Sequence, residues 1–387
     1  MKILVLSFYY PPDLCAGSFR CIALVQALKQ LGHEVQVLTT LPNRYATFDA
    51  GAPEEEIKEG VSVRRMALPS HQNGMFDQAK VFLYFARHAA RYVKACDCDL
   101  VFATSGRLMT AALGAWISKQ LNIPLYLDIR DIFVDTIGDV LSPKLTFFLK
   151  PFFSCVERLT LSKATRVNLV SKGFETYFKA RYPKRSFSYF SNGVDEAFIR
   201  PAGLRVNAPR KRLTVLYAGN LGEGQGLHII IPELAKKMEG EIEFKIIGDG
   251  GSRLKLLKIL DEAACTNVTV LPPVERDALI AAYEEADVLF LHLNDYPAFY
   301  KVLPSKIFEY AAMGKPIWAG ISGYSETFVR EEIKNAAVFY PGDVSGACQV
   351  FKTLIFERQS RDAFIQKFER KKMMELMALD VLNVLGD

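Results

Sequence analysis

The sequence of 387 residues lacks the features of several special classes of protein. No run of about 18 uncharged apolar residues is present, which argues against a membrane-spanning helix. The apolar run at 3–10 is short and stops at Pro11-Pro12-Asp13, as a buried strand would, so we expect no secretion signal. Seven cysteines lack the spacing of zinc ligands, and no acidic cluster predicts a metal site. We therefore expect a cytoplasmic globular protein with reduced thiols.

The sequence also has little excess charge, +5 in total, but its two halves differ. Residues 1–200 contain 25 Lys and Arg against 18 Asp and Glu, whereas the remaining residues contain 23 against 25. A basic half beside a slightly acidic half indicates that the first half faces something anionic. No nucleic-acid-binding module is visible, so we expect no nucleic-acid partner and favour a membrane surface or a phosphate-bearing acceptor.

What the sequence does contain is an alternation of apolar runs and helical patterns. MKILVLSFYY is a continuous apolar run, which is typical of a parallel strand buried on both faces. A helical pattern separates this run from a second one, HEVQVLTT. A polar stretch at 201–212 precedes a second such series, which begins at LTVLYAG. We predict an α/β protein with two Rossmann-like, doubly wound domains facing across a cleft. These domains span 1–200 and 201–365, and a C-terminal helix at 366–387 packs back on the first.

Several motifs follow one another along the chain: PPDLCAGSFR, SNGVD, YAGNLGEGQGL, IIGDGG and LPSKIFEYAAMGKP. Over nearly the whole chain these motifs resemble the retaining glycosyltransferases of the GT-B fold, in particular family 4. The first resembles the start of the family's first domain, and the second resembles the turn before its interdomain linker. The other three follow in the family's order, and the last is the most specific of them. Within the family, the resemblance implies an enzyme that builds O-antigen, colanic-acid or capsule repeat units.

The chain departs from the family pattern at four positions. The family's Glu-x7-Glu motif keeps its second glutamate, Glu309, but has Lys301 at the first. Asn220 and Gln225 stand where the family has a phosphate-binding Arg and Lys, and Arg130 stands where many members have a histidine. We interpret these replacements as specialisation of the polysaccharide subgroup.

The donor site is predicted from the resemblance and from the ends of the strands, where α/β folds bind ligands. Glycine turns let the backbone approach a diphosphate, and Lys306 would neutralise its charge at a helix start capped by Ser305. Glu309 would accept hydrogen bonds from ribose hydroxyls. The predicted donor-binding residues are Gly17, Asn220, Gln225, Gly248, Asp249, Pro273, Ser305, Lys306 and Glu309. The alternatives are a flexible loop for the glycine turn, a plain helix start at Gly248-Asp249 and a solvated helix residue for Glu309.

Arg130 and Asp131, which follow the predicted strand at 124–129, are the predicted catalytic residues. The arginine would neutralise a phosphate, and the aspartate would accept the proton of the acceptor hydroxyl, although a surface ion pair is the alternative. Two stretches of the first half, 76–95 and 143–159, combine aromatic residues with cations. They predict peripheral contact with the inner face of the cytoplasmic membrane, with ordinary core helices as the alternative.

Together these features predict transfer of a hexosyl residue, with an N-acetylated deoxyhexosyl residue as one option. The donor would be a nucleotide diphosphate sugar, with UDP favoured over GDP, and the acceptor a glycan linked to polyprenyl diphosphate. No cofactor beyond the donor and no metal ion is expected. A sugar-nucleotide 2-epimerase and a catalytically silent, glycosyltransferase-like partner subunit remain the alternatives. The absence of a G-x-G-x-x-G fingerprint disfavours an NAD-dependent dehydrogenase.

Overall fold

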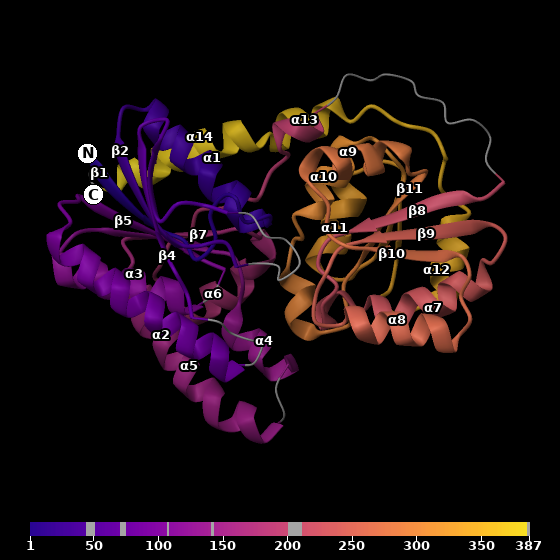
Figure 1. Cartoon of the computed structure of the whole chain (residues 1–387), viewed down its shortest axis with the longest axis horizontal. Coiled ribbons are helices and arrows are strands. Elements are labelled where there is room, and N and C mark those ends of the chain that lie inside the picture. Colours follow the sequence, from indigo (N-terminus) through magenta and orange to yellow (C-terminus); the bar gives the residue numbers. More distant parts are fainter. Residues whose placement is uncertain (44–50, 70–74, 107, 141–142, 200–210, 385–387) are drawn as a thin grey trace. The chain divides into compact units, whose positions relative to one another are not determined.

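The structure is a computed structural model, and it describes residues 1–43, 51–69, 75–106, 108–140, 143–199 and 211–384. The chain divides into two compact units, shown in Figure 1. Unit 1 comprises Met1–Asn192 with Arg370–Asp387, and unit 2 comprises Gly193–Glu369. The division therefore falls before the predicted boundary at residue 200. Most of the polar stretch on which that prediction rested, 201–210, lies outside the described residues.

Unit 1 is built on a seven-stranded sheet in the order β3-β4-β2-β1-β5-β6-β7. Its strands are β1 (Lys2–Leu6), β2 (Glu34–Thr40), β3 (Glu55–Lys58), β4 (Val61–Met66), β5 (Leu100–Ser105), β6 (Leu125–Ile129) and β7 (Arg166–Leu169). All neighbours run parallel except β3, which pairs antiparallel with β4 at the edge. The central strands β1 and β5 are buried on both faces, which explains their unbroken apolar runs.

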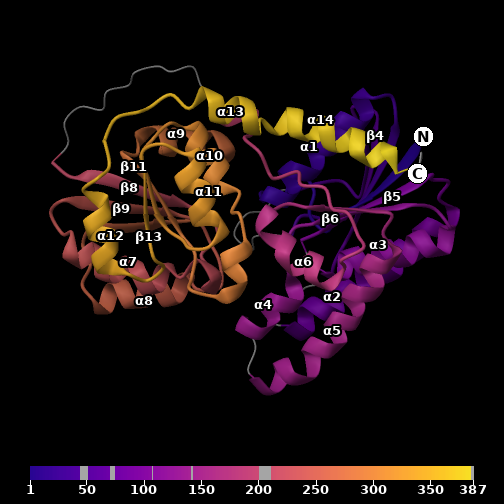
Figure 2. The same ribbon diagram turned by 180° about the vertical axis from the view of Figure 1, so that it is seen from behind.

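Helices flank this sheet, as Figures 1 and 2 show. They are α1 (Ala16–Gln30), α2 (Met75–Tyr92), α3 (Leu108–Leu121), α4 (Phe133–Val140), α5 (Pro143–Lys163), α6 (Glu175–Arg181) and α14 (Arg370–Asn383). Strand order reverses between β1 and β5, so the start of α1 and the loops after β5 and β6 lie at the carboxyl edge beside the switch point.

Unit 2 repeats the arrangement with a six-stranded, wholly parallel sheet in the order β10-β9-β8-β11-β12-β13. The strands are β8 (Leu213–Ala218), β9 (Ile242–Ile247), β10 (Val268–Leu271), β11 (Val288–His292), β12 (Ile317–Gly320) and β13 (Ala336–Phe339). The helices are α7 (Leu227–Lys237), α8 (Arg253–Glu262), α9 (Arg276–Glu285), α10 (Lys306–Ala312), α11 (Tyr324–Glu332), α12 (Val344–Phe351) and α13 (Asp362–Phe368). The prediction of two Rossmann-like α/β domains is confirmed.

The C-terminal region forms two helices where the sequence predicts one helix at 366–387. Helix α13 ends at Phe368 inside unit 2, whereas α14 packs on α1 in unit 1 and buries Met374, Met377 and Val381. The break falls at Glu369, which forms a parallel bridge with Val194. A tertiary contact thus interrupts a sequence that reads as continuous helix.

Helix α14 is also held to unit 1 by polar contacts at Asp380. The Tyr126 hydroxyl donates to this carboxylate at 2.8 Å, and the Ser188 hydroxyl donates to it at 2.6 Å. Arg166 pairs with its other oxygen at 3.1 Å. Residues from two strands and a loop of unit 1 therefore fix the last helix of the chain in place.

Candidate active site

The loops that follow β8 and β9 in unit 2 pack backbone against backbone. The Leu221 N–H donates to the Asp249 carbonyl oxygen at 2.8 Å. A Cβ atom on Gly248 would overlap the Gly219 carbonyl oxygen, and one on Gly250 would lie 2.7 Å from the Leu221 carbonyl oxygen. Gly248 and Gly250 also have φ angles of 153° and 157°, which side chains disfavour. Glycine is therefore required where these two loops meet beside the switch point.

Lys306 opens α10 and places its ammonium group against the turn after β8. A Cβ atom on Gly219 would overlap Lys306 Nζ, so the missing side chain makes room for the cation. Nζ also lies 5.2 Å from the centroid of the Tyr217 ring, whose hydroxyl donates to the Asn220 carbonyl at 2.7 Å. The structure thus brings a cation and a glycine turn together at the end of the first strand of the sheet.

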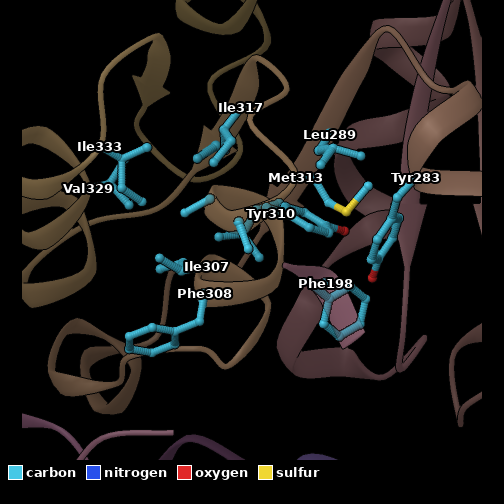
Figure 3. Packing of buried hydrophobic residues seen from close by; sticks show 14 of the residues in the cluster. Phe198, Tyr283, Leu289, Ile307, Phe308, Tyr310, Met313, Ile317, Val329 and Ile333 are labelled. Atoms are coloured by element: carbon cyan, nitrogen blue, oxygen red, sulfur yellow. The ribbon is translucent and has the colours of Figure 1, made fainter. Parts of the chain in front are cut away.

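Glu309 lies in the first turn of the same helix and is half-buried. The Tyr283 hydroxyl donates a hydrogen bond to Glu309 Oε2 at 3.2 Å. Figure 3 shows Tyr283 beside Tyr310, and the two rings meet edge to face with centroids 5.4 Å apart. Burial and the charge of Glu309 raise the pKa of Tyr283 well above its usual value, so its hydroxyl stays a donor. A fixed phenol therefore orients one oxygen of the carboxylate.

Asn220 and Gln225, predicted to bind the donor, contact each other. The Asn220 amide donates to Gln225 Oε1 at 2.7 Å, and the Gly222 N–H donates to the same oxygen at 3.1 Å. These two side chains shape the glycine turn from within. His292, the last residue of β11, also holds this turn, because its Nδ1–H donates to the Gln225 carbonyl at 2.7 Å.

The imidazole of His292 is neutral and held in one tautomer. Its Nε2 accepts from the Gly342 N–H at 3.1 Å while Nδ1 donates to the Gln225 carbonyl. Burial lowers the pKa of His292 to about 4. The ring therefore joins the loop after β8 to the loop after β13.

The predicted capping role of Ser305 is wrong, and so is the alternative reading of Gly248-Asp249 as a helix start. Ser305 has helical backbone angles and its side chain makes no capping hydrogen bond, because the chain already turns helically before α10. Asp249 does not cap α8, which begins after Ser252, and its Oδ1 instead accepts from the N–H of Gly250 at 2.8 Å. Pro273 lies two residues beyond β10 and is half-buried at the same sheet edge.

In unit 1, the structure brings Arg130 and Gly17 together. Arg130 follows β6, and a Cβ atom on Gly17, in the first turn of α1, would overlap Arg130 Nη1. A Cβ atom on Gly106, which follows β5, would lie 3.4 Å from the same nitrogen. Arg130 Nε is buried and makes no hydrogen bond within the described residues, while Asp131 is exposed. The guanidinium therefore lies at the switch point of this sheet.

Asp128 is structural. It forms a bidentate pair with Arg20, from Nε at 2.8 Å and from Nη2 at 2.9 Å, and both side chains are almost completely buried. The Asn168 amide also donates to it at 2.7 Å. Burial alone would raise the pKa of Asp128, but the charge and hydrogen bonds of Arg20 lower it below the usual value. This network connects α1 to β6 and β7, next to the loop that carries Arg130.

The two aromatic, basic stretches of unit 1 differ. In α2, Phe82 and Phe85 are buried, so this stretch contributes largely to the core. In α5, by contrast, Phe147 and Phe148 are each 75% exposed and Phe152 is 57% exposed. Within the described residues, no helix is both long and apolar enough to cross a membrane. The same residues contain no group of three or more His, Cys, Asp or Glu side chains that could hold a metal ion.

Sequence reasoning missed the residues that support Lys306 and Glu309. Tyr217, Tyr283 and His292 occur within apolar strand and helix patterns and read as core residues. Arg361 is missed in the same way: it is buried and donates to five backbone carbonyls, among them those of Tyr310 and Ala311 in α10. Their partners lie far away in sequence, so a local pattern carries no signal of these contacts.

Comparison with known proteins defines the class to which the chain belongs. Residues 20–193 match the glycosyl transferase 4-like domain, and residues 205–371 match the glycosyl transferases group 1 family. With its two Rossmann-like domains, the chain belongs to the GT-B glycosyltransferases of family 4, as its motifs predict.

Particular relatives share most of its length. The chain is 26% identical over 349 residues to the putative colanic acid biosynthesis glycosyl transferase WcaI of Escherichia coli K12, with 84% of each protein covered. Sucrose-phosphate synthase from Thermosynechococcus elongatus superposes with a TM-score of 0.77 at 16% identity, over 99% of this chain and 98% of that one. Anabaena HepE, in complex with UDP, superposes with a TM-score of 0.60 at 17% identity, over 99% and 97% of the two chains. These two structures share the fold of this chain.

Proposed function

We propose that the chain transfers a hexosyl residue from a nucleotide diphosphate sugar to a glycan carried on a polyprenyl diphosphate, in surface polysaccharide biosynthesis. The observation that carries this proposal is the position of Lys306 against Gly219, with Glu309 one turn further along the same helix. A cation beside a glycine turn suits a diphosphate, and a carboxylate oriented by Tyr283 suits the paired hydroxyls of a ribose. The name of the relative WcaI, which assigns it to colanic acid biosynthesis, supports the polysaccharide context.

In this proposal the main chemical task of unit 2 is to stabilise the leaving nucleoside diphosphate. Breaking the bond between sugar and phosphate places additional negative charge on the diphosphate. Lys306 opposes that charge, and the glycine turns after β8 and β9 let backbone amides approach it. Transfer with retention of configuration follows from the family resemblance, and the proposal includes no separate cofactor.

Unit 1 would supply the charge and the base that face the acceptor. Arg130 carries a buried Nε without a hydrogen-bond partner among the described residues, and its guanidinium lies against the first turn of α1. A phosphate oxygen of the donor or acceptor would satisfy this group. Asp131, which is exposed, is proposed to accept the proton of the acceptor hydroxyl.

UDP is the proposed nucleotide, and the UDP complex of the fold relative HepE supports this choice. The enzyme is proposed to work at the inner face of the cytoplasmic membrane, where a polyprenyl-linked acceptor would be found. One observation favours a second candidate, a silent partner subunit: Asn220 and Gln225, which replace cations of the family, bond to each other.

Calorimetric titration with UDP, GDP and NAD tests the donor site. We expect UDP to bind the wild-type protein, and both Glu309→Ala and Lys306→Met to weaken binding at least about tenfold, since each removes a charge-assisted contact. Lys258→Met is the matched control, because Lys258 is 76% exposed on α8. Binding of no nucleotide, or equal binding by all variants, would refute the donor site and favour the silent subunit. Conversion of the donor without any acceptor would instead identify an epimerase.

A further inference from the structure

Helix α5 carries an exposed apolar stripe that no other element of unit 1 covers within the described residues. Leu145, Phe148, Phe152, Cys155 and Leu159 are all exposed and follow one another at intervals of three and four residues. This spacing places them on one face of the helix, over a length of about 21 Å. Leu149, Phe153 and Val156, which are less exposed, lie about a quarter-turn round the helix from this stripe, and α5 packs on α3 and α4.

The exposed part of α5 also has charge of only one sign. Lys144, Lys150, Arg158 and Lys163 are all exposed. The sole carboxylate of the helix, Glu157, is buried and accepts hydrogen bonds from tyrosine hydroxyls of unit 1. Because successive helical residues turn by about 100°, Lys144 and Lys163 lie beside the stripe, Arg158 lies further round the helix and Lys150 lies on its far side. A ligand on this face therefore meets large apolar side chains with a cation near each end of the stripe, and no exposed carboxylate on the helix.

We propose that this face of α5 docks on an anionic lipid bilayer, with Phe148 and Phe152 inserted between the headgroups. Aromatic side chains with cations beside them match the apolar and anionic layers of a membrane interface. In Figures 1 and 2 the first turns of α5 extend away from the sheet of unit 1, which leaves the stripe accessible within that unit. The inference rests on the proposed function, since it assigns the surface by which a lipid-linked acceptor is reached.

A second copy of the chain fits this face less well than a bilayer. A symmetric pair of α5 helices would bring the cations of one copy near those of the other, and like charges repel. Anionic headgroups instead complement the cations beside the stripe, Lys144 and Lys163. The charge of the helix therefore selects the bilayer.

Vesicle co-sedimentation of the full chain tests the assignment. We expect binding to vesicles of phosphatidylglycerol and phosphatidylcholine, and much weaker binding to phosphatidylcholine alone. Phe148→Ser/Phe152→Ser should weaken binding about a hundredfold, roughly tenfold for each inserted ring. Lys144→Gln/Lys163→Gln should weaken it roughly fivefold for each lysine. All four positions are exposed, so thermal unfolding should be unchanged in both variants.

Ile57→Ser/Leu254→Ser is the matched control, since these residues are 82% and 77% exposed outside α5. Failure of the wild type to bind anionic vesicles, or equal binding by the phenylalanine variant, overturns the proposal. Dimerisation that the phenylalanine variant abolishes, seen by analytical ultracentrifugation without vesicle binding, assigns the stripe to a second copy. UDP titration of the same preparations separates a failure of this proposal from a failure of the proposed function, because vesicle binding needs no nucleotide.

Discussion

Removal of the Tyr283 hydroxyl is the most direct test of how the donor site is held. Tyr283 is almost completely buried, and its hydroxyl donates to Glu309 Oε2 at 3.2 Å. Tyr283→Phe keeps the ring and its edge-to-face contact with Tyr310, and removes only this donor. The carboxylate then loses the bond that orients it while its charge remains.

The expected loss follows from the kind of hydrogen bond that is removed. A hydrogen bond to a charged group stabilises the folded protein by about 1.5–3 kcal/mol. Because this bond also orients Glu309 for the nucleotide, part of that free energy should be lost from UDP binding. We expect the UDP dissociation constant to rise about tenfold, which corresponds to about 1.4 kcal/mol. The free energy of unfolding should fall by about 1–2 kcal/mol, since a half-buried, charged acceptor loses its donor.

Tyr126→Phe in unit 1 provides the matched control. Its hydroxyl donates to the Asp380 carboxylate at 2.8 Å, so the same chemical change removes the same kind of bond. Both variants should lose similar stability in urea unfolding, but only Tyr283→Phe should lose UDP affinity in calorimetry. Unchanged UDP affinity in Tyr283→Phe, together with the expected loss of stability, would show that Tyr283 does not position a ribose-binding group.

Three further substitutions test the surroundings of the site. His292→Gln should flatten the dependence of stability on pH: the folded pKa of about 4 lies below the ordinary 6.5, so the neutral ring stabilises fully above pH 6.5 and loses this contribution as the pH falls to 4. The contribution is at most about 3.4 kcal/mol, and equal slopes of unfolding free energy in wild type and variant would contradict it. Asp128→Asn should lower the unfolding free energy by about 3–5 kcal/mol, because Arg20 stays charged and buried, with UDP affinity unchanged in calorimetry. Normal stability with lost affinity would instead move Asp128 into the binding site. Arg361→Ala should lower the thermal midpoint, at a cost of about 3 kcal/mol, because buried carbonyls lose their donors. A variant as stable as the wild type would show that those carbonyls find other partners.

The fold could be predicted from the sequence where burial leaves a pattern. Strands such as β1 and β8 are buried on both faces, so they read as unbroken apolar runs. Strand β3 was missed because its sequence, Glu-Glu-Ile-Lys, has no buried side, and Ile57 within it is 82% exposed. Only backbone pairing with β4 makes this segment a strand, and backbone pairing leaves no trace in residue types.

The candidate site could be predicted only where its residues lie close together in the sequence. Lys306 and Glu309 lie within one motif, so the sequence indicates both. The hydrogen bond from Tyr283 joins positions 26 residues apart, and no spacing rule connects them. The role of Asp128 cannot be read from the sequence for a related reason. A carboxylate near a strand end is compatible with a catalytic base and with an ion pair, and only its contact with the buried Arg20 shows that it forms an ion pair.

Both units use the same local arrangement in the segment that follows their first strand: the loop after β8 in unit 2, and the first turn of α1 in unit 1. In unit 1 the space of a missing Cβ at Gly17 is filled by Arg130, and in unit 2 the space at Gly219 is filled by Lys306. Arg130 comes from the loop after β6 and Lys306 comes from α10, both later in the chain than the glycine that each contacts. Each cation therefore reaches the switch point only once the sheet has formed. Glycine has a double role here, since it admits the cation and leaves the backbone open to an anion. A side chain at either glycine would displace the charge that the fold delivers there, which ties the architecture of each sheet directly to the chemistry proposed for it.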